Sequence, residues 1–323
     1  MTPAGNRRRR AQRILGGLAV ALLLAALSLP TAVGVMLASF SGTRPQDLED
    51  RATPGDYGLS YRTVLLRSDD GVRIASWLLR ASRPAGCSVV LAHGLFRSRR
   101  EVLGRAAYLA ARGCHALTLD LRRHGDSGGT RTSLGFLEGL DVMAGARFLR
   151  REFPENRLYL LGVSMGGAAA GRAGAAMVAD VRGVVLDSTF KNVPEVVDRY
   201  AALLVGLPPF PAGDLTMLGL ELTAGFDPRE MDVERFSAQL GEAGVPVLVI
   251  AGDEDRRAPL EAQTAVFRAN GHPGSRLVVV EGATHGRPCL REPGVCEAAL
   301  AEFLDLPPEA AGTPAKLLYD PGA

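Results

Sequence analysis

The 323-residue sequence predicts an α/β protein built on a mostly parallel, doubly wound sheet. Short apolar runs rich in valine and leucine recur along the chain, and such runs are typical of strands that are buried on both faces. Segments with helical patterning separate these runs, which indicates crossover helices between parallel strands. The hydrophobic fraction of 47% is sufficient for a large core.

The first two strands are a predicted hairpin, because Tyr61–Arg67 and Val72–Arg80 alternate in polarity around Asp69-Asp70-Gly71. Six later runs are predicted as buried strands: Ser88–Ala92, His115–Leu119, Arg157–Val163, Gly183–Leu186, Val245–Ala251 and Arg276–Val280. The expected helices are Ser98–Arg112, Ser133–Phe153, Met165–Ala179, Pro259–Ala269 and Val295–Leu304. We therefore expect one domain over residues 58–306, with a lid inserted at about 190–244 and a tail at 307–323.

The N-terminus is predicted to be a membrane anchor. A basic segment, residues 1–13, precedes Ile14–Phe40, which contains no charged side chain. This apolar run is longer than a signal peptide requires and long enough to cross a bilayer. Arginines precede the run, and no excess of positive charge follows it, which predicts a cytoplasmic N-terminus and a catalytic domain outside the cytoplasm. The predicted span is 14–40, and a linker at 41–57 joins it to the domain.

The alternative is a cleaved signal peptide, since Ala26-Leu27-Ser28 fits a small-x-small cleavage site. Cleavage there would leave Leu29–Phe40 as an apolar mature terminus, which favours the uncleaved anchor. If cleavage did occur, the protein would be secreted, which is the alternative localisation.

The net charge of +2 gives no indication of a basic surface for nucleic acid.

The segment Leu160–Gly167, "LLGVSMGG", predicts a nucleophile. It follows a predicted strand and precedes an alanine-rich helix, and Gly-x-Ser-x-Gly in that context forms a sharp turn that exposes the serine hydroxyl. Gly162 and Gly166 lie where strand and helix pass too closely for side chains. Ser164 is therefore the candidate nucleophile.

A serine nucleophile requires a histidine base, which follows it in the chain in this architecture. Of the five histidines, only His272 and His285 follow Ser164. His272 precedes the last predicted strand and so lies at the opposite edge of the sheet. His285 comes just after that strand, at the same edge as Ser164, and is the candidate base.

A carboxylate must orient the base. The strand "VLVIAG" ends in a turn that holds Asp253 and Asp255, and Asp255 is the predicted acid because of its position before Pro259. Asp253 is the fallback, because one turn residue decides which carboxylate faces inward. Asp187, which ends an earlier strand, is a second alternative.

The negative charge that develops on the substrate oxygen needs two backbone N–H donors. We expect these donors from Met165, the residue after the nucleophile, and from Leu95 in the loop "LAHGLF". His93 in the same loop is expected to have a structural role. This chemistry implies no metal and no cofactor.

The sharp turn at Ser164, known as a nucleophile elbow, occurs together with the predicted acid, the histidine and the "HG" loop. With these features the chain resembles the α/β-hydrolase superfamily over about Tyr61–Leu304. "DLRRHGDSGG", Asp120–Gly129, is similar to a loop that shapes the floor of the site in that family. One span, a linker and a hydrolase domain resemble its single-pass membrane-anchored serine hydrolases. A departure is the pair Arg256-Arg257 beside the predicted acid, which could lower the pKa of that acid or face solvent.

The four cysteines suit an oxidising compartment. Cys87 and Cys114 each precede a predicted strand and would meet if those strands were neighbours. Cys289 and Cys296 would close a short loop after His285. The alternative is that all four are small buried apolar residues.

Residues 200–226 of the insertion are strongly apolar, which suits a lid over hydrophobic acyl chains, although they could merely pack on the sheet. The sequence thus predicts a membrane-anchored serine hydrolase acting on carboxylic esters, including thioesters and lipid esters. The open alternatives are an acyltransferase or a peptidase with the same triad, and a non-catalytic member that binds a partner at the cell surface.

Overall fold

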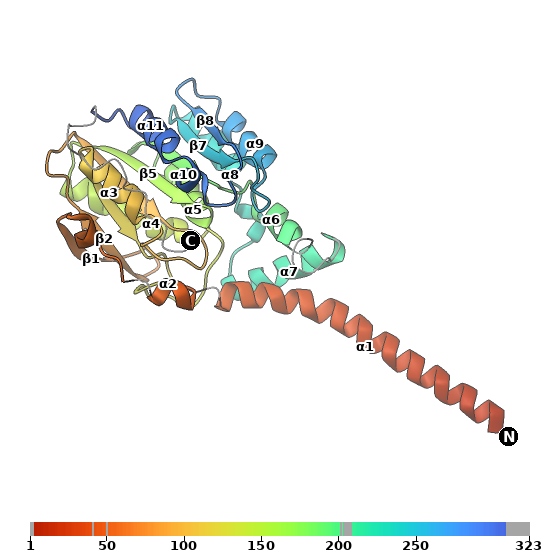
Figure 1. The fold of residues 1–323 in the computed structure, drawn as a ribbon. Coiled ribbons are helices and arrows are strands. Elements are labelled where there is room, and N and C mark those ends of the chain that lie inside the picture. Colours follow the sequence, from red (N-terminus) through yellow and green to blue (C-terminus); the bar gives the residue numbers. More distant parts are fainter. Residues whose placement is uncertain (1–2, 41, 50, 201, 203–208, 308–323) are drawn as a thin grey trace.

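A computed structural model describes residues 3–40, 42–49, 51–200, 202 and 209–307 (Figure 1). In this part of the chain one sheet has the strand order β1-β2-β4-β3-β5-β6-β7-β8. β1 pairs antiparallel with β2 and β2 with β4, while the remaining neighbours are parallel, which confirms the predicted sheet. The strands are β1 Tyr61–Arg67, β2 Arg73–Leu79, β3 Cys87–Ala92, β4 Cys114–Leu119, β5 Arg157–Val163, β6 Val181–Asp187, β7 Val247–Gly252 and β8 Arg276–Val280.

Helices cover both faces of the sheet (Figure 1). One face packs against four helices: α4 (Glu138–Glu152), α5 (Met165–Ala176), α8 (Val233–Glu242) and α9 (Leu260–Asn270). The other face packs against α3 (Leu103–Ala111), α10 (Pro288–Arg291) and α11 (Pro293–Phe303). Alternate residues of β3 divide between the two cores: Val90 lies in the first, whereas Val89 and Leu91 lie in the second. This explains why β3, β4 and β7 are buried at every position.

Helix α1, Pro3–Phe40, extends away from the sheet, and its C-terminal end lies beside α7, Pro209–Ala224 (Figure 1). Every residue from 12 to 29 is exposed, and in the described residues Gln12–Asp47 is the one stretch long and apolar enough to cross a membrane. Pro30, Gly34 and Ala38 are buried, and their spacing of four places them on one side of the helix.

The contact between α1 and α7 depends on two glycines. A Cβ atom at Gly34 would collide with the backbone of Thr216, and one at Gly219 would collide with the backbone of Thr31. Small residues at a crossing allow helix backbones to approach closely. The last turn of α1 is also held by the domain, because the backbone N–H of Thr132 donates to the carbonyl of Ala38 at 2.9 Å.

The predicted 41–57 linker contains α2 (Pro45–Glu49) and a 3₁₀ helix, η1 (Pro54–Tyr57). Residues 41 and 50 lie outside the described residues, as does the predicted tail apart from Pro307. The backbone N–H of Arg44 donates to the carbonyl of Phe96, so this segment contacts the loop after β3.

The predicted lid contains α6 (Val193–Tyr200), α7, a second 3₁₀ helix (η3, Pro228–Glu230) and α8. Residues 201 and 203–208 of it lie outside the described residues. α8 packs against α5 and α9 and so belongs to the helical layer of the sheet. The part that stands apart from that layer is therefore α6 and α7, and α7 is the helix that contacts α1.

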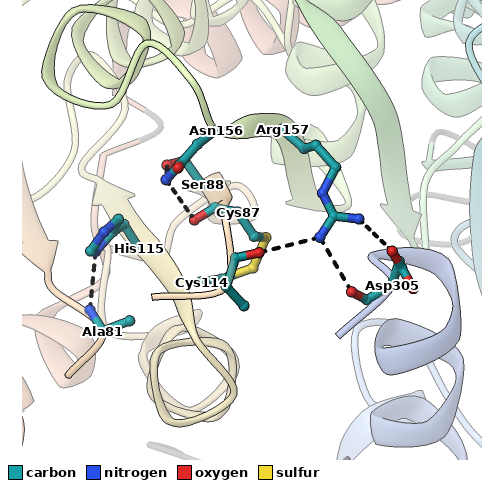
Figure 2. The surroundings of a disulfide bond; sticks show 9 residues. Ala81, Cys87, Ser88, Cys114, His115, Asn156, Arg157 and Asp305 are labelled. Atoms are coloured by element: carbon teal, nitrogen blue, oxygen red, sulfur yellow. Dashed lines mark hydrogen bonds and ion pairs between the residues drawn. A yellow bond between two sulfur atoms is a disulfide. The ribbon is translucent and has the colours of Figure 1, made fainter. Parts of the chain in front are cut away.

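Cys87 and Cys114 pair directly across β3 and β4 and are joined by a disulfide bond, which lies next to Arg157 (Figure 2). Arg157 forms an ion pair with Asp305. The side-chain amide of Asn156 donates to the carbonyl of Cys87. The bond thus links the N-terminal ends of two parallel strands, at the edge of the sheet opposite the carboxyl ends where β5 delivers Ser164.

Candidate active site

Ser164 occupies a sharp turn between β5 and α5. Its φ of 52° and ψ of −115° are unusual for a residue with a side chain, and this conformation projects the hydroxyl from the turn. The flanking glycines fit the predicted reason: a Cβ atom at Gly162 would collide with the backbone of Gly166, and one at Gly166 with the carbonyl of Ala92.

The structure brings Ser164, His285 and Asp255 together. The Nε2 atom of His285 lies 2.9 Å from Oγ of Ser164, and Nδ1 of His285 lies 2.8 Å from Oδ2 of Asp255. Asp255 is 3% exposed, and its Oδ1 also accepts hydrogen bonds from the backbone N–H groups of Arg257 and Ala258. These bonds fix the carboxylate so that it accepts the Nδ1–H of the imidazole, which leaves Nε2 free to accept a proton.

The two alternative carboxylates have other partners. Asp253 accepts a hydrogen bond at 2.7 Å from the backbone N–H of Gly282. Asp187 is buried at the end of β6 and forms an ion pair with Arg105 of α3 at 2.5 Å. Of the three candidates for the acid, the carboxylate that contacts His285 is that of Asp255.

The loop after β3, which is predicted to supply one of the two backbone donors, lies beside Ser164. Gly94 lies close to Ser164, because a Cβ atom at Gly94 would be 3.6 Å from Cβ of Ser164. Leu95 follows it and lines the cavity above Ser164. Met165 is the first residue of α5, where a backbone N–H has no acceptor within the helix.

Glu101 holds the loop in place, and sequence analysis missed it. The backbone N–H of Gly94 donates to Oε2 of Glu101 at 2.6 Å, and Arg97 forms an ion pair with the same carboxylate. Burial raises the pKa of the Glu101 carboxyl, while the hydrogen bond from Gly94 and the charge of Arg97 oppose that rise. The sequence signal was a glutamate seven residues after the "HG" turn.

His93 is fully buried behind the same loop, as expected for a structural histidine. Its Nδ1 lies 2.7 Å from the carbonyl of Gly94, and its Nε2 accepts a hydrogen bond from the backbone N–H of Leu121. Burial, with the nearby His124 and Arg97, places the pKa of His93 well below its usual value. The ring is therefore neutral and donates from Nδ1.

Ser164 and His285 line a cavity of about 380 Å³. Its walls come from the loop after β3, from α3, from the loops after β7 and β8, and from Tyr200 at the end of α6. The described lining residues are Arg44, Gly94, Leu95, Phe96, Arg97, Glu101, Arg105, Val163, Ser164, Tyr200, Arg257, His285, Gly286, Arg287 and Leu290. Arg257, whose place was left open, therefore lies on the cavity wall.

Cys289 and Cys296 are joined by a disulfide bond that links α10 to α11. Both are fully buried, and Cys289 lies four residues after His285. The backbone N–H of Gly286 donates to Oγ of Ser188, which gives the histidine loop a second attachment.

Comparisons with known proteins agree with this fold. Residues 83–223 match the family described as "Serine aminopeptidase, S33". The structure resembles that of the Pyrococcus furiosus esterase Pf2001 with a TM-score of 0.68 and 26% identity, over 83% of this chain and 98% of the esterase. The chain is also 25% identical to the uncharacterized protein YqkD of Bacillus subtilis, over 68% of this chain and 71% of that protein.

Proposed function

Because the chain belongs to the α/β-hydrolase superfamily, we propose that it is a serine hydrolase that cleaves carboxylic esters through an acyl-enzyme. The observation that carries the proposal is the continuous hydrogen-bonded chain from Ser164 through His285 to Asp255. The similarity to an esterase at 26% identity supports ester hydrolysis in particular.

In the proposed reaction, Oγ of Ser164 attacks the acyl carbonyl while Nε2 of His285 takes the hydroxyl proton. The buried carboxylate of Asp255 stabilises the imidazolium that forms. The backbone N–H groups of Met165 and Leu95 hold the oxyanion. His285 then gives its proton to the leaving alcohol, and a water molecule activated by the same histidine releases the acid.

We also propose that α1 anchors the enzyme in a membrane, with the domain outside the cytoplasm. The support is an apolar helix whose residues 12–29 are all exposed. Two disulfide bonds are consistent with an oxidising compartment. Secretion after cleavage near Ser28 remains the alternative. The face of α1 that packs on α7 begins at Pro30 and would remain in either form.

A peptidase is the second candidate, favoured by the match to a family described as serine aminopeptidases. An acyltransferase would share every step up to the acyl-enzyme, so products formed with competing alcohols and amines separate it from a hydrolase. A non-catalytic binding protein would keep the fold without turnover.

The test is labelling with a fluorophosphonate probe in separated membrane and soluble fractions. We expect wild type and the exposed-site control Ser60→Ala to be labelled in the membrane fraction, and Ser164→Ala to be folded but unlabelled. An ester panel and an aminoacyl panel then assign the substrate. Esterase activity retained in Ser164→Ala would refute the proposed nucleophile.

A further inference from the structure

The cavity above Ser164 has an unusual distribution of charge. Among the described residues that line it, five are arginines and one, Glu101, carries a carboxylate. The arginines are Arg44, Arg97, Arg105, Arg257 and Arg287. They come from five segments: the predicted linker, the loop after β3, α3, and the loops after β7 and β8.

The carboxylates that balance part of this charge lie behind the wall. Asp47 is 5% exposed and pairs with both Arg44 and Arg97, and Asp187 is 1% exposed and pairs with Arg105. Neither aspartate lines the cavity. Charges at the wall act on the interior more strongly than charges behind it, because the Coulomb energy falls with distance. The lining of the cavity therefore carries more positive than negative charge.

Arg257 and Arg287 both line the cavity. Both side chains are exposed, and they come from the two loops that carry the acid and the base. The backbone N–H of Arg257 donates to Asp255, so its main chain is fixed relative to the triad. Burial raises the pKa of the Tyr200 phenol, and the charge of Arg257 and a side-chain hydrogen bond with it oppose that rise. Arg257 therefore also reaches the α6 side of the cavity.

We propose that this cavity selects esters that carry a carboxylate group close to the scissile carbonyl, and that Arg257 and Arg287 bind that carboxylate. The inference rests on the proposed ester hydrolysis and names its substrate class. A guanidinium presents parallel N–H donors that match the two oxygens of a carboxylate. A neutral acyl chain in the same cavity would not use the positive charge of these two guanidinium groups.

Two matched pairs of esters test the proposal on the full-length enzyme. Mono-4-nitrophenyl adipate against methyl 4-nitrophenyl adipate places the charge on the acyl side. 4-Acetoxybenzoate against methyl 4-acetoxybenzoate places it on the leaving group. We expect kcat/KM to favour the anionic member of at least one pair by about tenfold, which corresponds to about 1.4 kcal/mol. The preference should shrink at high salt, which screens charge.

Arg256 provides the matched control, because it is adjacent to Arg257 and exposed but does not line the cavity. Arg257→Gln and Arg287→Gln should each reduce the anionic-to-neutral ratio of kcat/KM several-fold, whereas Arg256→Gln should preserve it. Equal or better use of the neutral ester in both pairs would overturn the proposal. So would an Arg256→Gln effect as large as that of Arg257→Gln.

A binding measurement keeps this inference separate from the proposed function. Calorimetry on Ser164→Ala compares adipate with dimethyl adipate, and 4-hydroxybenzoate with methyl 4-hydroxybenzoate, without turnover. If an anion binds more tightly than its neutral ester, and Arg257→Gln removes this difference, the carboxylate site is supported. This holds even if no ester is cleaved, in which case only the hydrolase assignment fails. Binding of neither anion, in a protein that hydrolyses neutral esters, overturns the site and leaves the hydrolase intact.

Discussion

The Nε2 atom of His285 lies 2.9 Å from Oγ of Ser164, although 121 positions separate the two residues in the chain. Each sits just beyond the carboxyl end of a parallel strand, Ser164 after β5 and His285 after β8. Because parallel strands end at one edge of the sheet, the fold makes this contact from two short local turns.

The first prediction concerns the acid. Asp255→Asn should lower kcat by about 10³- to 10⁴-fold, because an amide in place of the carboxylate favours the wrong tautomer of His285 and does not stabilise the imidazolium. Asp253→Asn is the matched control: its carboxylate binds Gly282, so we expect kcat within about threefold of wild type. Measuring kcat for ester hydrolysis with the two purified variants tests this prediction. A larger loss for Asp253→Asn would move the acid to that position.

The second prediction concerns Glu101, which positions the loop that carries Leu95. Glu101→Ala removes the acceptor for the backbone N–H of Gly94 and should lower kcat by about tenfold with little change in KM. Glu101→Gln keeps an acceptor oxygen and should restore most of kcat. If both variants lost only thermal stability and kept kcat, Glu101 would have a structural role alone.

The third prediction compares the two disulfide bonds. The Cys289→Ala/Cys296→Ala variant should lose activity, because the bond holds α10 directly after the histidine loop. The Cys87→Ala/Cys114→Ala variant should keep its activity. It should lose about 1 kcal/mol more free energy of unfolding than the other variant, because the Cys87–Cys114 bond closes the longer loop. Denaturant unfolding and ester kinetics on both variants measure the two effects. Equal loss of activity in both would show that bracing of the loop is unimportant.

The fourth prediction concerns pH. The buried His93 has a lowered pKa, so the unfolded chain binds a proton near pH 6.5 while the folded chain does not. The free energy of unfolding should therefore fall as the pH drops below about 6.5, by up to about 1.4 kcal/mol per pH unit from this residue. Denaturant unfolding between pH 7.5 and 5 measures the slope. His93→Gln should have a shallower slope, and an unchanged slope would assign the effect to other groups.

The fifth prediction concerns the contact between α1 and α7. Gly34→Leu should separate the helices, because even a Cβ atom at Gly34 collides with the backbone of Thr216. Gly17→Leu is the control, since a Cβ there meets nothing within 4 Å. Cysteine cross-linking between Val35 and Leu220 positions, in a membrane-reconstituted protein, should fail for Gly34→Leu and succeed for Gly17→Leu. Cross-linking in both would mean that the crossing tolerates bulk.

Sequence reasoning succeeded where a feature is local. The backbone of Ser164 depends on a strand, a turn and a helix that follow one another, so its conformation could be anticipated from eight residues. Helix boundaries were less predictable: helix was expected from Ser133, but α4 begins at Glu138. The Glu138 carboxylate accepts hydrogen bonds from the backbone N–H groups of Ser133 and Gly135, which holds the preceding turn in a non-helical form.

The walls of the cavity could not be predicted in the same way. The buried pair of Arg105 and Asp187 joins residues 82 positions apart on α3 and β6, and no periodicity marks either residue as a partner of the other. Tyr200 reaches the cavity because α6 is placed by contacts with α7 and η3. Such residues become visible only when distant elements have been assembled.

In the proposed membrane-anchored form, the contact of α1 with α7 would also limit the height above the bilayer that the active site can reach. A span joined to its domain by loose chain lets the active site sample a wide range of heights above the bilayer. Here the exposed residues 12–29 and the packed Pro30, Gly34 and Ala38 belong to one continuous helix, which ends at Phe40. At a rise of about 1.5 Å per residue, the eleven residues from Pro30 to Phe40 have a length of about 16 Å. The active site would then stay at a nearly constant distance from the bilayer surface. Substrates at other distances would have to diffuse to it.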